Sequence, residues 1–363
     1  MSANKMEMNV RKSFTPNPVF IDGPSRSGKG GVGFALASLA RTEHLLTRNI
    51  IDRLWTLYSV GLLEKNAAID SIITERDFKL WFNYLGRNLN TNVHDITSVL
   101  NSRDPEMYKK RMEGQDTEEA FNLFLETIKR EQPITLDITD EMLYESELLY
   151  EAFPNLKIVV VMRHPIDLAF SWHRSGRGWR YGKDPRMIHP TFNFGDIRNI
   201  PTLAIDWPDE YNKLNPVEKA SKSISMIMVE YINYLEDIPP NRKESIIVVP
   251  FEEFITNTHL WLNKLCDFLG TETTDATPRM LKQARVPRVI NVKDFEKKYY
   301  GLKYNVSDEI FTELMICSER FEKLINPVFS INEVSKEDSS FSYSTNFNDY
   351  FPRPAYIKGE RKN

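Results

Sequence analysis

The sequence predicts an α/β fold, a doubly wound parallel sheet in three layers with helices on both faces and a phosphate-binding loop of the P-loop type. Three observations predict it. Short apolar segments alternate with helical periodicity along most of the 363 residues, which is typical of parallel sheets with crossover helices. The clearest segment, residues 157–162, is apolar at successive positions, as in a strand that is buried on both faces. The first apolar segment runs directly into a glycine-rich turn and a helical pattern.

That turn has the residues of a phosphate-binding loop. After the apolar residues 19–21 it reads Gly-Pro-Ser-Arg-Ser-Gly-Lys-Gly over residues 23–30, and a helical pattern follows. Backbone N–H groups and a helix dipole favour an anion at such a point. Gly30 stands where nucleotide triphosphatases carry the Ser or Thr that holds Mg²⁺, so the loop suits an anion but not ATP–Mg²⁺ chemistry. A βα turn without a ligand is the alternative. The candidate binding residues of the loop are Ser25, Arg26, Ser27, Gly28, Lys29, Gly30 and Gly31.

The other elements follow from periodicity, turn residues and capping signals. Residues 171–207 are rich in Arg, Gly, Pro, His and Trp, and we expect a long functional loop there instead of a regular element. Residues 1–16 form a polar lead-in, residues 17–330 a single domain and residues 331–363 a C-terminal tail. The expected elements are helices across residues 42–130, a strand at 133–138, a helix ending at 153, a strand at 157–162, and a helix from about 165. Beyond these come a helix at 217–235, a strand at 244–250 and a helix at 260–269.

Composition excludes several classes of function. The hydrophobic fraction of 41% and charged fraction of 27% are those of a soluble globular protein. The net charge of −4 argues against a nucleic-acid partner. We expect no membrane partner and a cytoplasmic location, because no signal peptide and no stretch of about 20 apolar residues is found. Cys266 and Cys317 are too few for a disulfide framework or a Cys/His metal site, and we expect both to be buried free thiols.

A second group of anion-binding residues follows the central strand. Arg163 comes directly after it, at the carboxyl end where parallel sheets hold their ligands. Pro165 and Asp167 are typical of a helix start, which places Ser171 two turns along that helix. A guanidinium and a hydroxyl that converge there make a second phosphate site. The alternative is a surface ion pair for Arg163 and a solvated position for Ser171.

With these motifs the chain resembles the sulfotransferases that use 3′-phosphoadenylyl sulfate (PAPS). The Arg-Ser-Gly core within residues 21–33 resembles the loop that holds the 5′-phosphosulfate. Residues 153–171 resemble the family's strand with its Arg-x-Pro-x-Asp and Ser arrangement for the 3′-phosphate. Residues 249–254 and 262–270 are similar to a strand-to-helix segment late in the domain.

The chain departs from the family pattern in two places. Lys29 and Gly30 stand where the family generally has two hydroxyl residues, so the donors of the loop differ. The basic motif that closes over the 3′-phosphate near the C-terminus is not recognisable. Arg285 and Arg288 are our candidates for that role, and a solvated basic turn is the alternative.

The resemblance implies transfer of a sulfuryl group from PAPS, without a metal, to a hydroxyl or amine of a small-molecule or glycan acceptor. Arg26 matches the position of the family's catalytic Lys, and Lys29 is an additional catalytic cation on the same loop. A base must take the proton of the acceptor. Asp137, at the end of the second strand, is the first candidate, with Asp140 and His94 as the alternatives.

Two other functions fit a phosphate loop. One is a small-molecule or nucleotide kinase, which Gly30 and the Arg163/Ser171 pair count against. The other is a non-catalytic nucleotide-binding protein, which would bind PAPS without transfer. The aromatic and basic residues 172–181 are expected to border the acceptor pocket. The identity of the acceptor and the oligomeric state do not follow from the sequence.

Overall fold

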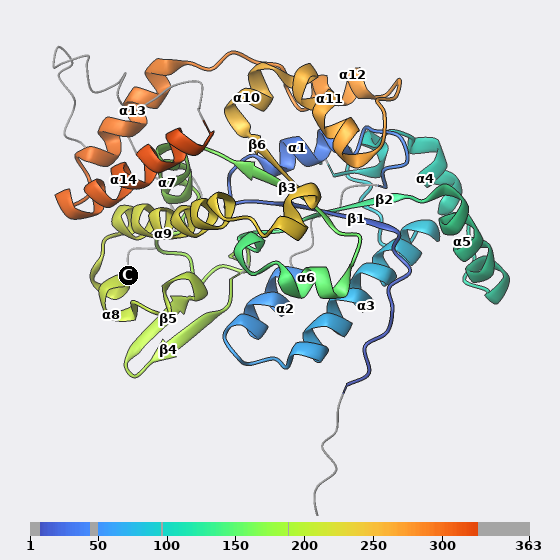
Figure 1. Ribbon diagram of the computed structural model, residues 1–363, viewed down its shortest axis with the longest axis horizontal. Helices are drawn as coiled ribbons and strands as arrows, with labels where there is room; N and C mark the ends of the chain where they lie inside the picture. Colours follow the sequence, from blue (N-terminus) through green and yellow to red (C-terminus); the bar gives the residue numbers. More distant parts are fainter. Residues whose placement is uncertain (1–7, 44–49, 96, 188, 326–363) are drawn as a thin grey trace, which may run out of the picture.

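The central element of the structure is a four-stranded parallel sheet with the strand order β2-β1-β3-β6 (Figure 1). It is a computed structural model that describes residues 8–43, 50–95, 97–187 and 189–325. The neighbouring strands pair in parallel throughout, which confirms the predicted fold class. The strands are β1 (Asn17–Asp22), β2 (Ile134–Ile138), β3 (Lys157–Met162) and β6 (Ile246–Pro250).

Helices cover both faces of this sheet (Figure 1). One apolar core lies between the sheet and a layer that includes α3, α7, α9 and α14, and a second lies between the sheet and α1, α10, α11 and α12. The helices are α1 (Lys29–Leu36), α2 (Ile50–Ser59), α3 (Lys65–Tyr84), α4 (Pro105–Arg111), α5 (Glu118–Glu131), α6 (Glu147–Ala152), α7 (Pro165–Arg174), α8 (Pro208–Lys213), α9 (Pro216–Glu236), α10 (Phe251–Thr256), α11 (Thr258–Leu269), α12 (Thr277–Gln283), α13 (Val292–Lys303) and α14 (Asp308–Ile325). The 3₁₀ turns are η1 (Val99–Asn101), η2 (Leu143–Glu145), η3 (Thr202–Ala204) and η4 (Pro240–Ser245).

The strand order creates a switch point between β1 and β3. The chain leaves β1 into α1, which packs on the α11 and α12 side, and leaves β3 into α7, which packs against α9 on the other side. Because the two connections diverge, the carboxyl ends of these strands are the place where doubly wound folds bind ligands. The glycine-rich loop and Arg163 both follow these two strands.

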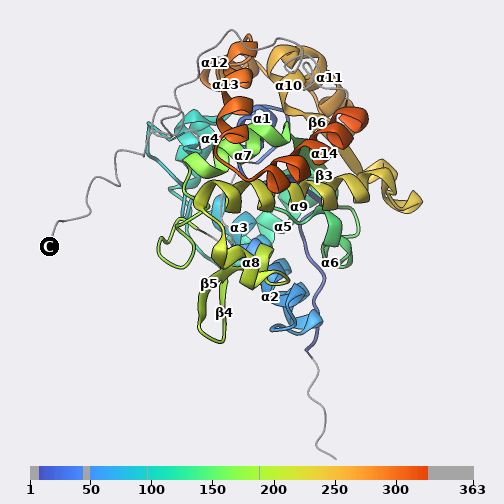
Figure 2. The same ribbon diagram turned by 90° about the vertical axis from the view of Figure 1, so that its left-hand side faces the viewer.

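The segment at residues 171–207 differs from the expected loop. Helix α7 continues to Arg174, and residues 191–201 form an antiparallel hairpin of β4 (Thr191–Phe194) and β5 (Ile197–Pro201). Its small apolar cluster gathers around Ile200 and Tyr211 of α8, and Figure 2 shows the hairpin extending from the body beside α8. The two strands have only four and five residues, which is too short for a search for periodicity to detect.

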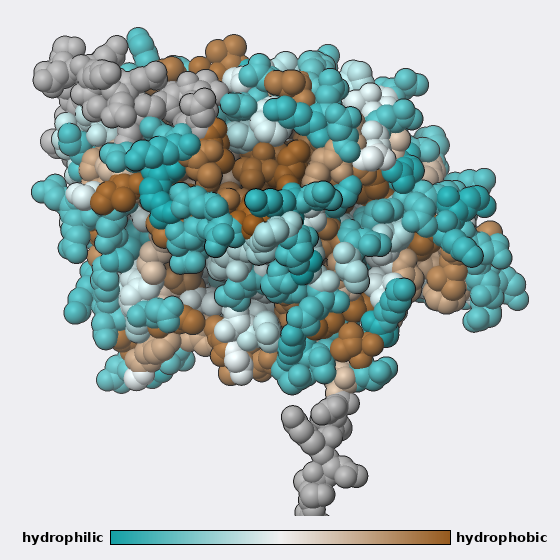
Figure 3. Space-filling view, viewed as in Figure 1, coloured by the Kyte–Doolittle hydropathy of each residue, from teal (hydrophilic) through white to brown (hydrophobic). Residues whose placement is uncertain are grey.

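The remaining expectations concern the surface, the thiols and the termini. In the part of the chain that the structure describes, no helix is both long and apolar enough to cross a bilayer. The face in Figure 3 is mostly hydrophilic with small apolar areas. Cys266 and Cys317 are buried free thiols, as expected. The expected tail and the first seven residues of the lead-in lie outside the described residues.

Candidate functional site

The loop between β1 and α1 packs tightly against β3 on one side and against α10 on the other. A Cβ atom on Gly23 would lie 2.3 Å from the backbone oxygen of Val161 on β3. Gly28 has a left-handed φ of 103°, and a Cβ atom there would lie 2.1 Å from the ring of Phe251. Only glycine avoids both the contact and the backbone strain at such positions. The loop shape therefore depends on β3 and on the first residue of α10.

The loop offers unpaired donors to an anion. Ser27 is fully buried, and its Oγ has no hydrogen-bond partner among the described residues, whereas buried hydroxyls are normally paired. Cβ atoms on Gly30 or Gly31 would meet no atom within 4 Å, so the space at the first turn of α1 is open. The first N–H groups of a helix also lack intrahelical partners. These features fit a phosphate or phosphosulfate group.

Arg26 contacts both Arg163 and Ser171 beside the loop, and their joint binding of a phosphate stays a prediction. Arg26 lies at the exposed tip of the loop with a left-handed φ of 74°. Its Nε donates a hydrogen bond to Ser171 Oγ on α7 (3.2 Å). Arg163, directly after β3, donates from Nη1 to the backbone oxygen of Arg26 (3.3 Å). Helix α7 begins at Pro165 as expected, and this start directs Ser171 toward the loop.

The ring of Phe251 brings a second pair of guanidinium groups together. The Cζ atoms of Arg163 and Arg288 lie 5.2 and 5.7 Å from its centroid. The backbone N–H of Arg288 is fixed by the carbonyl of Ile255 (2.7 Å). Burial, together with the charges of Arg163 and Arg285, lowers the pKa of Arg288. The segment around residues 285–288 therefore adjoins the site. Arg288 and Arg163 lie over the same aromatic ring, a proximity that the sequence does not indicate.

Two further residues hold the loop, although the sequence places them only at the border of an acceptor pocket. Arg177 donates from Nη2 to Ser25 Oγ, and Trp172 donates from Nε1 to the backbone oxygen of Ser25 (2.6 Å). Partial burial of its guanidinium and three neighbouring guanidinium groups, that of Arg177 foremost, lower the pKa of Arg26. The basic composition of residues 174–180 is the signal that could have indicated an anion contact. We call Arg26, Arg163, Arg177 and Arg288 the arginine cluster.

Lys29 points away from the open side of the loop. It is 4% exposed, and its Nζ donates to the backbone oxygen of Gly23 and to the carboxylate of Asp140. The sequence predicts a cation that faces the ligand, so this placement is a correction. Its physical reason is that a buried ammonium must be paired, and Asp140, in the connection after β2, offers a carboxylate beneath the turn.

Asp52, in the first turn of α2, is a third charged neighbour of this pair. Its Oδ1 accepts a hydrogen bond from the backbone N–H of Asp140 (2.8 Å), and its Oδ2 has no partner among the described residues. Burial and the Asp140 charge raise the pKa of Asp52 well above its ordinary value. Burial opposes ionisation of Asp140 too, but Lys29 outweighs it and holds that pKa below its ordinary value. The two carboxyl groups are thus driven into different protonation states.

Asp137 lies in a setting that differs from the expected one. It is 4% exposed on β2, and its carboxylate pairs with Arg76 and, at 3.3 Å, with Lys79, both on α3. Arg76 is itself buried, and its Cζ atom lies 4.6 Å from the centroid of the Phe20 ring. The carboxylate therefore faces α3 behind the sheet and not the loop. Since β2 alternates its side chains between two faces, a position inside the strand could not be assigned to the ligand side from sequence.

His94, the last base candidate, is exposed in a turn, and no hydrogen bond or ion pair among the described residues joins it to the glycine-rich loop, Arg163 or Ser171. Its backbone N–H donates to the side chain of Asn92 (3.1 Å). Asn101, which bonds the same turn, accepts a hydrogen bond from Gln283 of α12 (3.1 Å). The structure does not bring His94 together with Arg26, Arg163 or Ser171.

Glu141 and His189 link the loop to a pocket, and neither was found from sequence because the two lie far apart in the chain. Glu141 Oε1 accepts a hydrogen bond from the backbone N–H of Ser25 (2.8 Å), and its Oε2 lies 3.0 Å from His189 Nε2. His189 lines a pocket of about 500 Å³ between α2 and residues 182–187 and 189–192. A histidine beside a carboxylate can hold and move a proton. We call this pocket the histidine pocket.

Comparison with known proteins gives one match to a family. A model described as the sulfotransferase family matches residues 86–275, more than half of the chain. The matched range includes Arg163 and Ser171 and begins after the glycine-rich loop. A search of the curated proteins found no match.

The chain is also similar to several solved structures. The sulfotransferase domain from the curacin biosynthetic pathway is 15% identical with a TM-score of 0.44, and the alignment covers 86% of this chain and 98% of that one. A sulfotransferase from Alicyclobacillus acidocaldarius is 15% identical with a TM-score of 0.39, over 86% and 97% of the two chains. One from Mycobacterium avium is 11% identical with a TM-score of 0.43, over 87% and 78%.

Proposed function

The chain belongs to the sulfotransferase family, and from this premise we propose that it transfers a sulfuryl group from PAPS to a hydroxyl or amine of a small-molecule or glycan acceptor. The product nucleotide is 3′,5′-adenosine bisphosphate (PAP), and the transfer needs no metal ion. One observation carries the proposal. The arginine cluster and Ser171 converge on a glycine-rich loop with an unpaired buried hydroxyl, at the switch point of the sheet. Two adjacent anion sites suit a nucleotide that carries groups at both its 3′ and 5′ positions.

Each part of the loop has a role in this proposal. PAPS, when bound, supplies a sulfuryl group whose bond to the 5′-phosphate oxygen breaks as a bond to the acceptor forms. Ser27 and the first N–H groups of α1 would hold the phosphosulfate, while Arg163 and Ser171 would hold the 3′-phosphate. Arg26 stabilises charge that develops on the leaving phosphate, and fixed donors of this kind usually contribute more to catalysis than any other single effect. A guanidinium stays protonated, so Arg26 acts as a charge and hydrogen-bond donor and not as an acid.

For the base we propose His189, with Glu141 as its positioning residue. His189 lines a pocket that can admit an acceptor, and Glu141 contacts both the imidazole and the backbone of Ser25. The Glu141 carboxylate therefore holds the proposed base, His189, in a fixed position beside the glycine-rich loop. Asp140 is a weaker base, because its contact with Lys29 keeps its pKa low. Asp137 is already occupied by Arg76 and Lys79.

Calorimetry with PAP, ATP–Mg²⁺ and ADP tests the donor side of the proposal. We expect PAP to bind without metal and Arg163→Ala to weaken it by about 10- to 100-fold, since a charge-assisted contact is worth roughly 1.5–3 kcal/mol. Binding of adenosine 5′-phosphosulfate, which lacks the 3′-phosphate, should change much less. Arg320→Ala is the matched control, because Arg320 pairs with Glu236 at the surface. Binding of ATP–Mg²⁺ with no binding of PAP would instead support the kinase alternative.

Single-turnover transfer from labelled PAPS to a competent acceptor tests the base. His189→Gln should lower the rate by about 10²–10⁴-fold, as is typical when a general base is removed, and PAP affinity should not change. Glu141→Gln should lower the rate less and shift the acid limb of the pH–rate profile, because it acts through His189. A normal rate in His189→Gln would reject this assignment and return attention to Asp140.

A further inference from the structure

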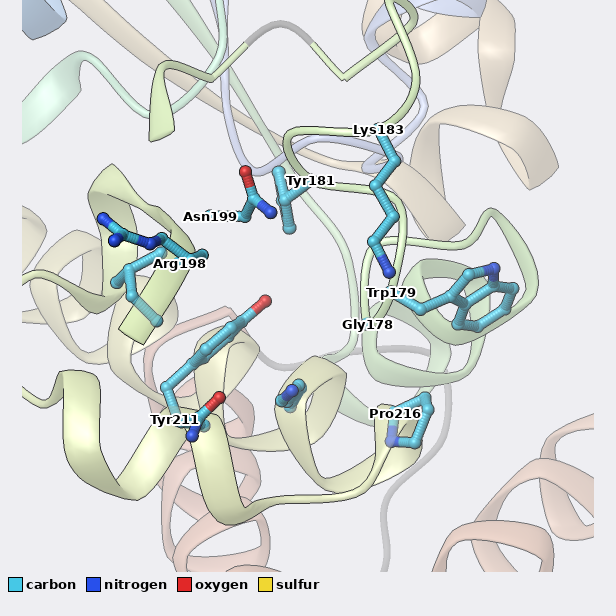
Figure 4. Close-up of a pocket in the computed structure, with 11 residues that line it drawn as sticks. Gly178, Trp179, Tyr181, Lys183, Arg198, Asn199, Tyr211 and Pro216 are labelled. Carbon is cyan, nitrogen blue, oxygen red and sulfur yellow. The ribbon is translucent and has the colours of Figure 1, made fainter. Parts of the chain in front are cut away.

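A second pocket, of about 240 Å³, lies across residues 178–183 from the histidine pocket. Figure 4 shows that its walls come from this segment, from the hairpin and from the helices at residues 208–219. The side chains that give it its chemical character are Lys183, Arg198, Asn199, Tyr211, Asn212 and Lys219. We call it the basic pocket.

The charge of the basic pocket is not neutralised by the protein. No carboxylate is among its lining residues, and within the described ranges no ion pair is found for Lys183, Arg198 or Lys219. Two acids near the pocket pair with other cations: Asp184 with Arg180 and Arg186, and Glu210 with Lys222.

The position of Lys219 in α9 adds to the excess of positive charge in the basic pocket. Lys219 lies in the first turns of the helix, where the dipole is positive and a cation is disfavoured. The N–H groups of this terminus are capped by the Asn215 side chain, and Glu218 bonds back to the backbone of Asn215. Burial and the nearby ammonium of Lys183 lower the pKa of Lys219. The ammonium of Lys219 therefore lies where Lys183 and the helix dipole both disfavour it, and it has no ion pair among the described residues.

The donors of the basic pocket converge. Figure 4 shows the ammonium of Lys183 and the hydroxyl of Tyr211 directed toward the centre of the pocket. The Lys219 ammonium lies 4.8 Å from the centroid of the Tyr211 ring. Ammonium groups, a hydroxyl and amides around one hollow form a donor set for a multi-oxygen anion.

We propose that the basic pocket binds an anionic group of the acceptor: a sulfate, a phosphate or a carboxylate. This inference rests on the proposed function and names the class of acceptor. Lys183 lines both the basic pocket and the histidine pocket, so one molecule can reach both. Gly178, at the wall of the basic pocket, follows Arg177, which bonds Ser25 of the glycine-rich loop. An acceptor with its anion in the basic pocket would present a neighbouring hydroxyl toward His189.

The test is anion binding to protein whose nucleotide site is already filled. Protein saturated with PAP is titrated with sodium sulfate and, separately, with sodium phosphate at constant ionic strength, and the melting temperature is followed. Glucuronate and glucose 6-phosphate, each compared with glucose, then distinguish a carboxylate from a phosphate on a sugar. We expect the anions to raise the melting temperature and glucose to have no effect. In Lys183→Gln/Lys219→Gln the apparent dissociation constants should rise at least tenfold.

Lys213→Gln, at the exposed end of α8 outside the lining, is the matched control and should behave as the wild type. Equal anion-dependent shifts in the double variant and the wild type would overturn the proposal, as would no shift in the wild type. Failure of the proposed function is seen separately, as a lack of PAP binding. In that case the titration is run on Arg163→Ala, in which the nucleotide site is weakened and the basic pocket is intact.

Discussion

Two buried ion pairs near the end of β2 are similar in chemistry and different in position. Arg76 pairs with Asp137, and Lys29 pairs with Asp140, and both cations are at most 4% exposed. Asp137 is inside the strand and faces α3, whereas Asp140 follows the strand and lies beneath the glycine-rich loop. The first pair is enclosed by helix and sheet, while the second lies against the backbone of the glycine-rich loop, at Gly23. Asp137 and Asp140 are only three residues apart in the sequence, yet one forms an ion pair in the core and the other forms an ion pair at the candidate site.

The largest expected effect is a loss of stability when the Arg76–Asp137 pair is broken, larger than the loss when the Lys29–Asp140 pair is broken. Asp137→Asn leaves Arg76 and Lys79 charged and buried without their carboxylate, and we expect the free energy of unfolding to fall by about 3–5 kcal/mol. Arg76→Met/Asp137→Leu should recover part of this loss, because an apolar pair removes the uncompensated charge. Urea unfolding measures both. If Asp140→Asn were equally destabilising, the comparison would fail.

A second test uses pH. Burial and Asp140 raise the pKa of Asp52 from 3.8, so the stability that Asp52 contributes is present in acid and lost as pH rises through its raised folded-state pKa. Relative to the wild type, Asp52→Asn should therefore gain stability as pH rises above about 4, by at most about 1.4 kcal/mol per pH unit.

Asp140 should show the opposite sign in the same measurement. Its pKa is held below 3.8, so its contribution is present above that value and lost as pH falls through its lowered folded-state pKa. Relative to the wild type, Asp140→Asn should therefore gain stability as pH falls below about 4, whereas Asp52→Asn gains it as pH rises. Urea midpoints at half-unit intervals test both expectations, and parallel curves for the two variants would contradict them.

The smallest effect concerns the nucleotide. Asp140→Asn removes a negative charge beside the anion site and leaves Lys29 uncompensated, so PAP should bind more tightly by about 1 kcal/mol, roughly fivefold. Lys29→Met should weaken PAP by a similar amount. Calorimetry at low and at moderate salt measures the change, which should shrink as salt screens it. If PAP affinity changed in neither variant, the Lys29–Asp140 pair would have no more influence on the nucleotide than the Arg76–Asp137 pair, and the comparison would fail.

The donor side of the site follows from local signals, and the acceptor side does not. A strand, a glycine-rich turn and a helix are consecutive, and Arg163 with Ser171 are placed by one strand end and one helix start. These are short-range relations that spacing can predict. The topology then brings the two segments together, because parallel strands present their carboxyl ends at one edge.

His189 and Glu141 show why the rest could not be predicted. Their contact depends on how residues 175–187 pass the glycine-rich loop, and this path is set by tertiary packing that leaves no periodic signal in the sequence. The orientation of Lys29 was missed for a related reason. Asp140 was visible as a carboxylate, but nothing in its spacing indicated that it would lie under the turn.

Arg26 carries its side chain on a backbone conformation that suits glycine or asparagine better, with φ at 74°. Such a conformation costs a bulky residue on the order of 1–3 kcal/mol. We expect selection for stability alone to replace this residue, and selection for turnover alone to keep it, because we propose Arg26 as the donor to the leaving phosphate. A directed-evolution experiment that rewards only heat resistance should therefore lose this arginine early, and lineages that lose it should be the ones that can no longer transfer.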